Sequence, residues 1–73
     1  LDDITRLHAN WLKIRDLTGL EYCSNLQWLD LRGNQIVDVS PLAGLTNLQW
    51  LYLRGNQITD VSSLAELKCV LLI

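Results

Sequence analysis

His8 and Asp30 are the two side chains in this chain of 73 residues whose types and spacing most resemble catalytic machinery. They occupy equivalent positions in neighbouring copies of an internal repeat, so neighbouring strands would bring them side by side. A carboxylate beside an imidazole can orient the ring, as in the dyad that activates a nucleophile. However, no Ser or Cys lies on the same predicted sheet face to act as that nucleophile, and a small open sheet encloses no pocket that would exclude water. The sequence therefore predicts a protein that is not an enzyme.

Candidate ligands for metals and phosphates are sparse. Asp16, Asp38 and Asp60 recur with the same period and would form a column that resembles a calcium site, but a single Asp in a turn normally accepts hydrogen bonds from backbone N–H groups. Cys23 and Cys69 have no second Cys or His nearby at metal-ligand spacing, so we expect buried or half-buried free thiols. The short RGN segments lack the spacing and the Lys of a phosphate-binding loop. We therefore expect no metal and no cofactor.

Repeated Trp and Arg residues form a second kind of candidate site. Trp28 and Trp50 occupy equivalent positions in two successive copies of the repeat, and so do Arg32 and Arg54. Trp and Arg are enriched at the hot spots of protein interfaces, so an exposed column of them favours a protein partner. Two alternatives remain open. The Trp rings could simply pack on each other and cover the sheet, and Asp30 could neutralise the Arg side chains from a diagonal position, in place of a partner's carboxylate.

These residues are positioned by a repeat that covers almost the whole chain. Residues 26–47 read LQWLDLRGNQIVDVSPLAGLTN and residues 48–69 read LQWLYLRGNQITDVSSLAELKC, with identity at 16 of 22 positions. A degenerate first copy spans residues 1–25, and residues 70–73 begin a further copy that stops at VLLI, two residues into what would be a fourth strand. A period of this length is typical of a solenoid, so we expect one domain over residues 1–73.

Each copy contains a predicted strand, a turn and a return segment. WLDLR and WLYLR alternate with period two, which predicts strands with leucines on the core face, and the strands must be parallel because all copies run in the same direction. In the RGNQI turn, Asn34 and Asn56 are expected to hydrogen-bond the backbone as a ladder from coil to coil, whereas Leu12 occupies this position in the first copy. In VSPLAGL, Ser40 before Pro41 suits the start of a single helical or 3₁₀ turn.

The pattern L-x-x-L-x-L-x-x-N-x-I in LQWLDLRGNQI and LQWLYLRGNQI resembles the leucine-rich repeat signature. The repeat length and the continuation DVSPLAGLTNL are similar more narrowly to the bacterial internalin type, and IRDLTGLEYCSNL resembles the opening repeat of such proteins. The resemblance implies an α/β solenoid with a short parallel β-sheet on its concave face and 3₁₀ or short helical turns on its convex face. It also implies recognition of a protein partner through side chains on the sheet, which here are Trp28, Asp30, Arg32, Trp50, Tyr52 and Arg54, with His8 at the side.

The charge and hydropathy of the sequence argue against two kinds of partner, nucleic acid and the membrane interior. The net charge is −2 and no stretch carries a run of one sign, which argues against nucleic acid. No apolar stretch approaches the roughly 18 residues of a membrane span, so we expect no membrane insertion. The internalin resemblance implies a protein displayed on bacterial cells or released from them. The free cysteines leave open a cytoplasmic scaffold similar to the phosphatase-regulating proteins that also use repeats of this length.

The two ends of the predicted solenoid suggest a different role. The sequence shows no N-terminal helical cap ahead of Leu1 and no C-terminal cap after VLLI, so we expect exposed core leucines and unpaired strand edges at both ends. Such ends tend to associate with each other. The chain is therefore also a candidate for self-association, as a structural repeat fragment whose near-identical copies fit a recent duplication and a consensus-based sequence equally well.

Overall fold

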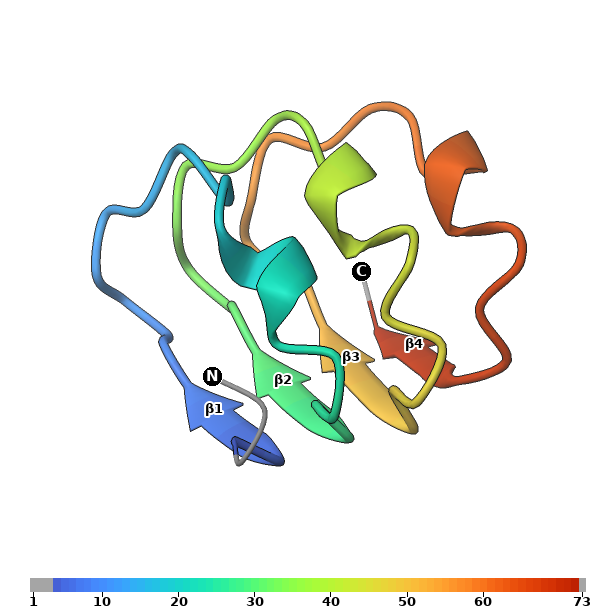
Figure 1. Ribbon diagram of the computed structural model, residues 1–73. Helices are drawn as coiled ribbons and strands as arrows, with labels where there is room; N and C mark the ends of the chain where they lie inside the picture. The colour runs from blue at the N-terminus through green and yellow to red at the C-terminus, as the bar shows by residue number, and fades with distance from the viewer. Residues whose placement is uncertain (1–3, 73) are drawn as a thin grey trace.

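The computed structural model describes residues 4–72, and in it the chain winds as a solenoid whose short strands lie side by side (Figure 1). The strands are β1 (Arg6–His8), β2 (Trp28–Asp30), β3 (Trp50–Tyr52) and β4 (Val70–Leu72). They form one parallel sheet in the order β1-β2-β3-β4. Each strand occupies one side of a coil, because the chain must return to the same edge before it can add the next parallel strand. The predicted α/β solenoid is confirmed.

The strand register follows the repeat at first and then departs from it. Each residue of β1 and β2 pairs with its equivalent in the next copy, as the sequence predicts. Trp50, however, pairs with Val70, whereas the strict period would pair it with Leu72. The expectation of only two residues in a fourth strand is therefore wrong, because β4 begins earlier, at Val70. This register turns Leu71 toward the core opposite Leu51, whereas the strict period would leave Leu71 outside the strand.

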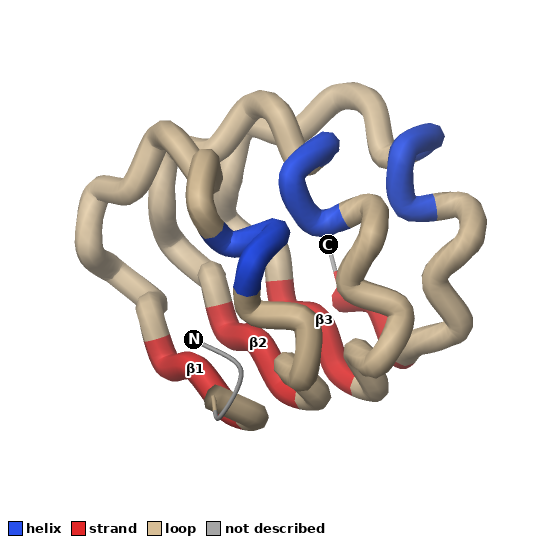
Figure 2. Tube along the Cα trace, viewed as in Figure 1, coloured by secondary structure: helices blue, strands red, loops and turns tan. Residues whose placement is uncertain are grey.

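Three 3₁₀ turns lie on the opposite side of the coils from the sheet, at η1 (Leu20–Tyr22), η2 (Ser40–Leu42) and η3 (Ser62–Leu64) (Figure 2). The second turn begins at Ser40 before Pro41, as the sequence predicts. The side chain that caps this turn is that of Asp38 and not that of Ser40, because Asp38 Oδ1 accepts the Ser40 N–H at 2.9 Å. Asp60 Oδ1 accepts the Ser62 N–H in the same way, also at 2.9 Å. These carboxylates thus act as local caps of the turns.

The core lies between the sheet and the 3₁₀ turns. Leu29 and Leu51, at the centres of β2 and β3, are fully buried, and Leu31 and Leu53 just after these strands are buried as well. These are the four leucines that the period-two alternation places on the core face, and burial of each contributes about 1.5–3 kcal/mol. The other buried hydrophobic residues are Ala9, Leu17, Cys23, Leu26, Ile36, Val39, Leu42, Leu45, Leu48 and Leu64.

The asparagines after the strands link each coil to the preceding one. The buried Asn34 side chain donates to the Ala9 carbonyl at 2.9 Å and accepts the N–H groups of Leu12 and Ile14 at 3.0 Å each. Asn56 makes corresponding bonds one coil later. Backbone groups in these tight turns have no strand partner, so the Asn side chains satisfy donors and acceptors that would otherwise be unpaired. Leu12, in the equivalent place of the first coil, is exposed.

The turn after β1 has a backbone that its residue types do not favour. Gly33 and Gly55 adopt positive φ angles of 68° and 80° in the later turns, which glycine does without steric cost. Trp11 occupies the equivalent position of the first turn with φ of 60°, and Lys13 follows with φ of 59°. A side chain in this region is strained, typically by about 1 kcal/mol or more. The first coil therefore adopts the backbone conformation of the later turns without the glycine that adopts it at no steric cost.

Candidate functional site

The outward side of the sheet carries the side chains that alternate with the buried leucines. We call this surface the concave face, and its members are Arg6, His8, Trp28, Asp30, Arg32, Trp50, Tyr52 and Arg54. Parallel pairing places Arg6, Trp28 and Trp50 in one column across the first three strands and His8, Asp30 and Tyr52 in the next. The Gly33 N–H donates to the Arg54 carbonyl at 2.9 Å, so backbone pairing continues to Arg32 and Arg54 beyond the strand ends. The structure thus gathers all the residues that the sequence assigns to this face.

Trp28 is the centre of the concave face. Its ring centroid lies 4.4 Å from that of His8 and 5.4 Å from that of Tyr52, which meets it edge-on at 68°. The Arg6 guanidinium lies 5.3 Å from the Trp28 ring, in cation–π range. Within residues 4–72 no ring contact joins Trp28 to Trp50, so the alternative in which the two Trp rings cover each other does not occur. Trp28 is half-buried, whereas Trp50 is 43% exposed.

Asp30 and Arg32 form a two-point ion pair within one strand segment. Arg32 Nε donates to Asp30 Oδ1 at 2.9 Å, and its Nη2 donates to Oδ2 at 2.6 Å. The hydrogen bond from Arg32 holds the pKa of the Asp30 carboxyl below its ordinary value, and the same pair raises the pKa of Arg32. The Arg32 guanidinium also lies 5.5 Å from the Tyr52 ring. Asp30 therefore neutralises Arg32 alone, from the same strand, and no carboxylate in the described part of the chain pairs with Arg54.

The geometry around His8 does not assemble the dyad that its spacing with Asp30 suggested. The two residues are paired in register, but the His8 ring lies against Trp28 and both Asp30 carboxylate oxygens are occupied by Arg32. Cys23 is a buried free thiol, and Cys69 is a half-buried one whose pKa is raised by burial. Neither thiol belongs to the concave face.

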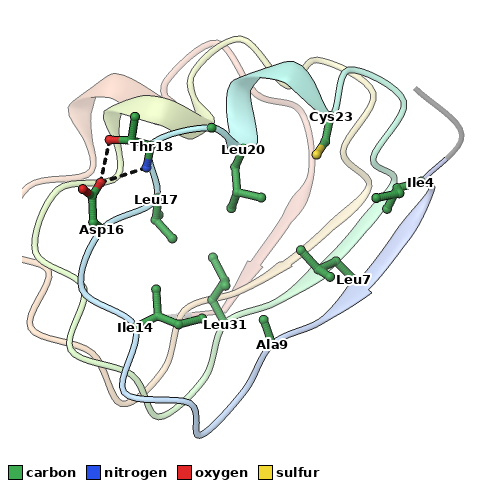
Figure 3. A pocket seen from close by; sticks show the side chains of 11 residues that line it. Ile4, Leu7, Ala9, Ile14, Asp16, Leu17, Thr18, Leu20, Cys23 and Leu31 are labelled. Atoms are coloured by element: carbon green, nitrogen blue, oxygen red, sulfur yellow. Dashed lines mark hydrogen bonds between the residues drawn. The ribbon is translucent and has the colours of Figure 1, made fainter. Parts of the chain in front are cut away.

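Two hollows adjoin the sheet. A cleft of about 220 Å³ beside the Arg6–Trp28–Trp50 column is lined by these three residues and by Thr5, Gln27 and Gln49. A larger cavity of about 470 Å³ lies at the end of the solenoid that carries β1 (Figure 3). Its walls are mostly apolar residues of the first coil, namely Ile4, Leu7, Ala9, Ile14, Leu17, Leu20 and Cys23, together with Leu31 of the second coil.

Trp11 is a candidate that sequence reasoning missed. Its side chain is 72% exposed, and its ring lies over Gly33, so close that an added Cβ there would come within 2.2 Å of the ring. The repeat alignment contains the signal, because Trp11 stands in the first copy where Gly33 and Gly55 stand in the later ones. A large aromatic residue held at a strained position with its ring exposed is the kind of feature found at functional sites.

Two features of the described residues bear on metals and membranes. No group of three His, Cys, Asp or Glu side chains within residues 4–72 is arranged to hold a metal ion. Asp16 binds the N–H and hydroxyl groups of Thr18 at 2.9 and 2.6 Å, so it caps its turn as Asp38 and Asp60 do. The same residues contain no helix with the length and apolar character needed to span a membrane.

A parallel sheet on one side, single 3₁₀ turns on the other and asparagines linking successive coils together define a class of repeat protein. The family model for leucine-rich repeats in two copies matches residues 24–68. The chain belongs to the leucine-rich repeat family.

Comparison with solved structures narrows the type of repeat. The chain is similar to the crystal structure of internalin InlF from Listeria monocytogenes, with 42% identity and a TM-score of 0.88 over 97% of this chain. It is also similar to internalin C2 of the same organism, with 35% identity and a TM-score of 0.53 over 84% of this chain. The chain covers 22% and 36% of the lengths of these two proteins. The repeats are thus of the bacterial internalin type.

Proposed function

We propose that the chain is a non-catalytic module that binds a protein partner through the concave face. The observation that carries this proposal is the exposure of Trp50 on a face where Trp28 is held by contacts with Arg6, His8 and Tyr52. Ordered neighbours reduce the conformational entropy that binding would cost, and an exposed Trp supplies apolar contact area. The family supports protein interaction as the role of such repeats.

The decisive experiment replaces Trp50 with Ala and measures capture of partners from candidate cell extracts, followed by affinity measurement with the purified partner. We expect binding to weaken by about tenfold to a hundredfold, as for a central aromatic hot spot. Tyr22→Ala is the matched control, since Tyr22 is an aromatic residue that is 69% exposed in η1, on the opposite side of the coil. Equal binding by both variants would show that the concave face is not the functional surface.

The internalin-type repeats support a location on the bacterial surface or outside the cell, and we propose that location for the protein that carries this chain. Fractionation of the source cells with an antibody against the repeats tests it. Recovery of the protein only from the cytoplasm would contradict the proposal and favour an intracellular scaffold.

A second candidate role is assembly through the ends of the solenoid. The apolar cavity of about 470 Å³ at the β1 end favours it, since contact with another apolar surface would cover its half-buried residues Ile4, Leu7, Ile14 and Leu20. Such assembly would make the size of the oligomer depend on the concentration of the chain.

A further inference from the structure

The concave face has a charge opposite to that of the whole chain. The chain carries six basic and eight acidic residues, yet among residues 4–72 three arginines and only one carboxylate lie on this face. The charge of that carboxylate, Asp30, is neutralised by its two hydrogen bonds from Arg32. Asp38 and Asp60 bond to Ser40 and Ser62 at the starts of η2 and η3, and Asp16 bonds to Thr18 just before η1. These 3₁₀ turns lie on the other side of each coil from the strands (Figure 2). The concave face therefore presents a net positive charge on a protein of net charge −2.

Arg32 and Arg54 are neighbouring cations on this face. They lie on neighbouring strand extensions, which are about 4.8 Å apart in a sheet, so one carboxylate can reach both. Asp30 holds Arg32 by its Nε and Nη2 atoms, which leaves the remaining guanidinium N–H groups free to donate elsewhere. The Arg32 side chain is 49% exposed despite this pairing. Arg32 is therefore an oriented donor, and Arg54 beside it forms no ion pair with any described residue.

Trp50 offers an apolar contact on the same face as the two arginines, since its side chain is 43% exposed. It borders a cleft of about 220 Å³ whose lining is mixed, with Thr5, Arg6, Gln27 and Gln49 beside Trp28 and Trp50. Trp50 and Arg54 are four residues apart along an extended segment, a span of about 13 Å. A partner that contacts both Trp50 and the two arginines must present a carboxylate and an apolar side chain at that separation.

We propose that the partner bound by the concave face is an acidic protein segment, whose carboxylate bridges Arg32 and Arg54 and whose apolar side chain packs against the exposed Trp50 ring. This inference rests on the proposed function and names the chemistry of the partner. Charge complementarity carries it, because like-charged segments are repelled while acidic ones are attracted and oriented. Phosphates of a nucleic acid could also meet the arginines, but three cations on a negatively charged chain give little of the attraction that such binding requires.

Fluorescence anisotropy with three labelled probes tests the proposal. The probes are a short peptide of Glu residues around one central Phe, the same peptide with Gln in place of every Glu, and a short single-stranded oligothymidine. We expect the Glu peptide to bind, the Gln peptide to bind at least about tenfold more weakly, and added salt to weaken binding of the Glu peptide. Arg54→Gln should reduce affinity for the Glu peptide by about tenfold. Arg15→Gln is the control, because Arg15 is an exposed arginine beyond the turn after β1, where it bonds to Gln35 at 2.7 Å.

The outcomes separate the inference from the function on which it rests. Equal binding of the Glu and Gln peptides, with loss on Trp50→Ala, would overturn the acidic partner but leave the concave face as a binding surface. Tighter binding of oligothymidine would replace the protein partner with a nucleic acid. If none of the probes binds, the acidic segment is excluded, while partner capture by the wild-type chain and not by Trp50→Ala would still support the proposed function. Thermal melts of the Arg54→Gln and Arg15→Gln proteins confirm that both are folded.

Discussion

Asp30 is an acidic residue on the outward side of the sheet that is nevertheless only 1% exposed, since Arg32 covers it. Its pKa is lowered from the ordinary value of 3.8, chiefly by the hydrogen bond from Arg32. The folded state therefore favours the ionised form, and this contribution to stability is complete above 3.8 and disappears as the pH falls through the lowered pKa. We predict that the free energy of unfolding, measured with urea, falls below about pH 4 and that Asp30→Asn flattens part of this fall.

Asp16, Asp38 and Asp60 contribute with the same sign, because hydrogen bonds from Thr18, Ser40 and Ser62 lower their pKa values as well. The Asp30→Asn profile should therefore remain partly pH-dependent. Glu66→Gln removes an exposed carboxylate and serves as the comparison. An unchanged acid profile in Asp30→Asn would contradict the role of the Asp30–Arg32 pair.

Among the described residues, Asn34 is the one whose side chain bonds to the most backbone groups. Asn34→Leu copies the residue that the first coil has at this position, and it leaves the Ala9 and Leu31 carbonyls and the Leu12 and Ile14 N–H groups without that partner. We predict a loss of about 3 kcal/mol or more in the free energy of unfolding, measured by chemical denaturation. Asn47→Ala, which removes one exposed bond to Ser24, should cost about 1 kcal/mol or less. Similar losses in both variants would argue against the ladder.

The turns after the strands are the elements in which the repeat places its strictest steric demand. A Cβ at Gly55, with φ of 80°, would lie 3.2 Å from the Gly33 backbone nitrogen, whereas a Cβ at Gly44 would meet nothing within 4 Å. We predict that Gly55→Ala lowers the free energy of unfolding by more than about 1 kcal/mol and that Gly44→Ala leaves it nearly unchanged. Thermal denaturation of the two single variants measures the difference.

Gly33 tests the role of Trp11 in the same type of element. Gly33→Ala should destabilise both through its φ of 68° and through displacement of the Trp11 ring, so part of its effect should vanish in a Trp11→Ala background. A double-mutant cycle gives the coupling. Additive effects would show that the ring over Gly33 contributes nothing to the turn.

At the scale of the whole molecule, association of isolated chains through the ends of the solenoid is a prediction. Leu72 in β4 is 39% exposed, and a strand at the edge of a sheet has backbone groups available to pair with another chain. We predict that the 73-residue chain associates as its concentration rises and that Leu72→Lys shifts it toward monomer. Val37→Lys, at an exposed apolar residue within the second coil, is the control. A constant monomer mass in sedimentation across concentrations would exclude this assembly.

Much of this fold follows directly from the pattern of the sequence. The internal repeat and the period-two leucines predict parallel strands, and Leu29 and Leu51 lie in the core as expected, because both depend on local spacing that each copy carries itself. The residue at which β4 begins could not be predicted from the period of the repeat. The third return segment is shorter, and pairing with β3 selects the register that brings Leu71 to the core.

The sequence by itself determined which residues share the concave face, since pleating and parallel pairing assign every second residue of each strand to one side. Only the tertiary structure decided how those side chains pair. Arg32 binds Asp30 on its own strand, and Trp28 meets His8 and Tyr52 in preference to Trp50. Such choices depend on rotamers and on contacts between neighbouring strands, which spacing alone does not specify. They leave Trp50 exposed and Arg54 without an ion pair in the described chain, and those two residues are where we expect a partner to bind.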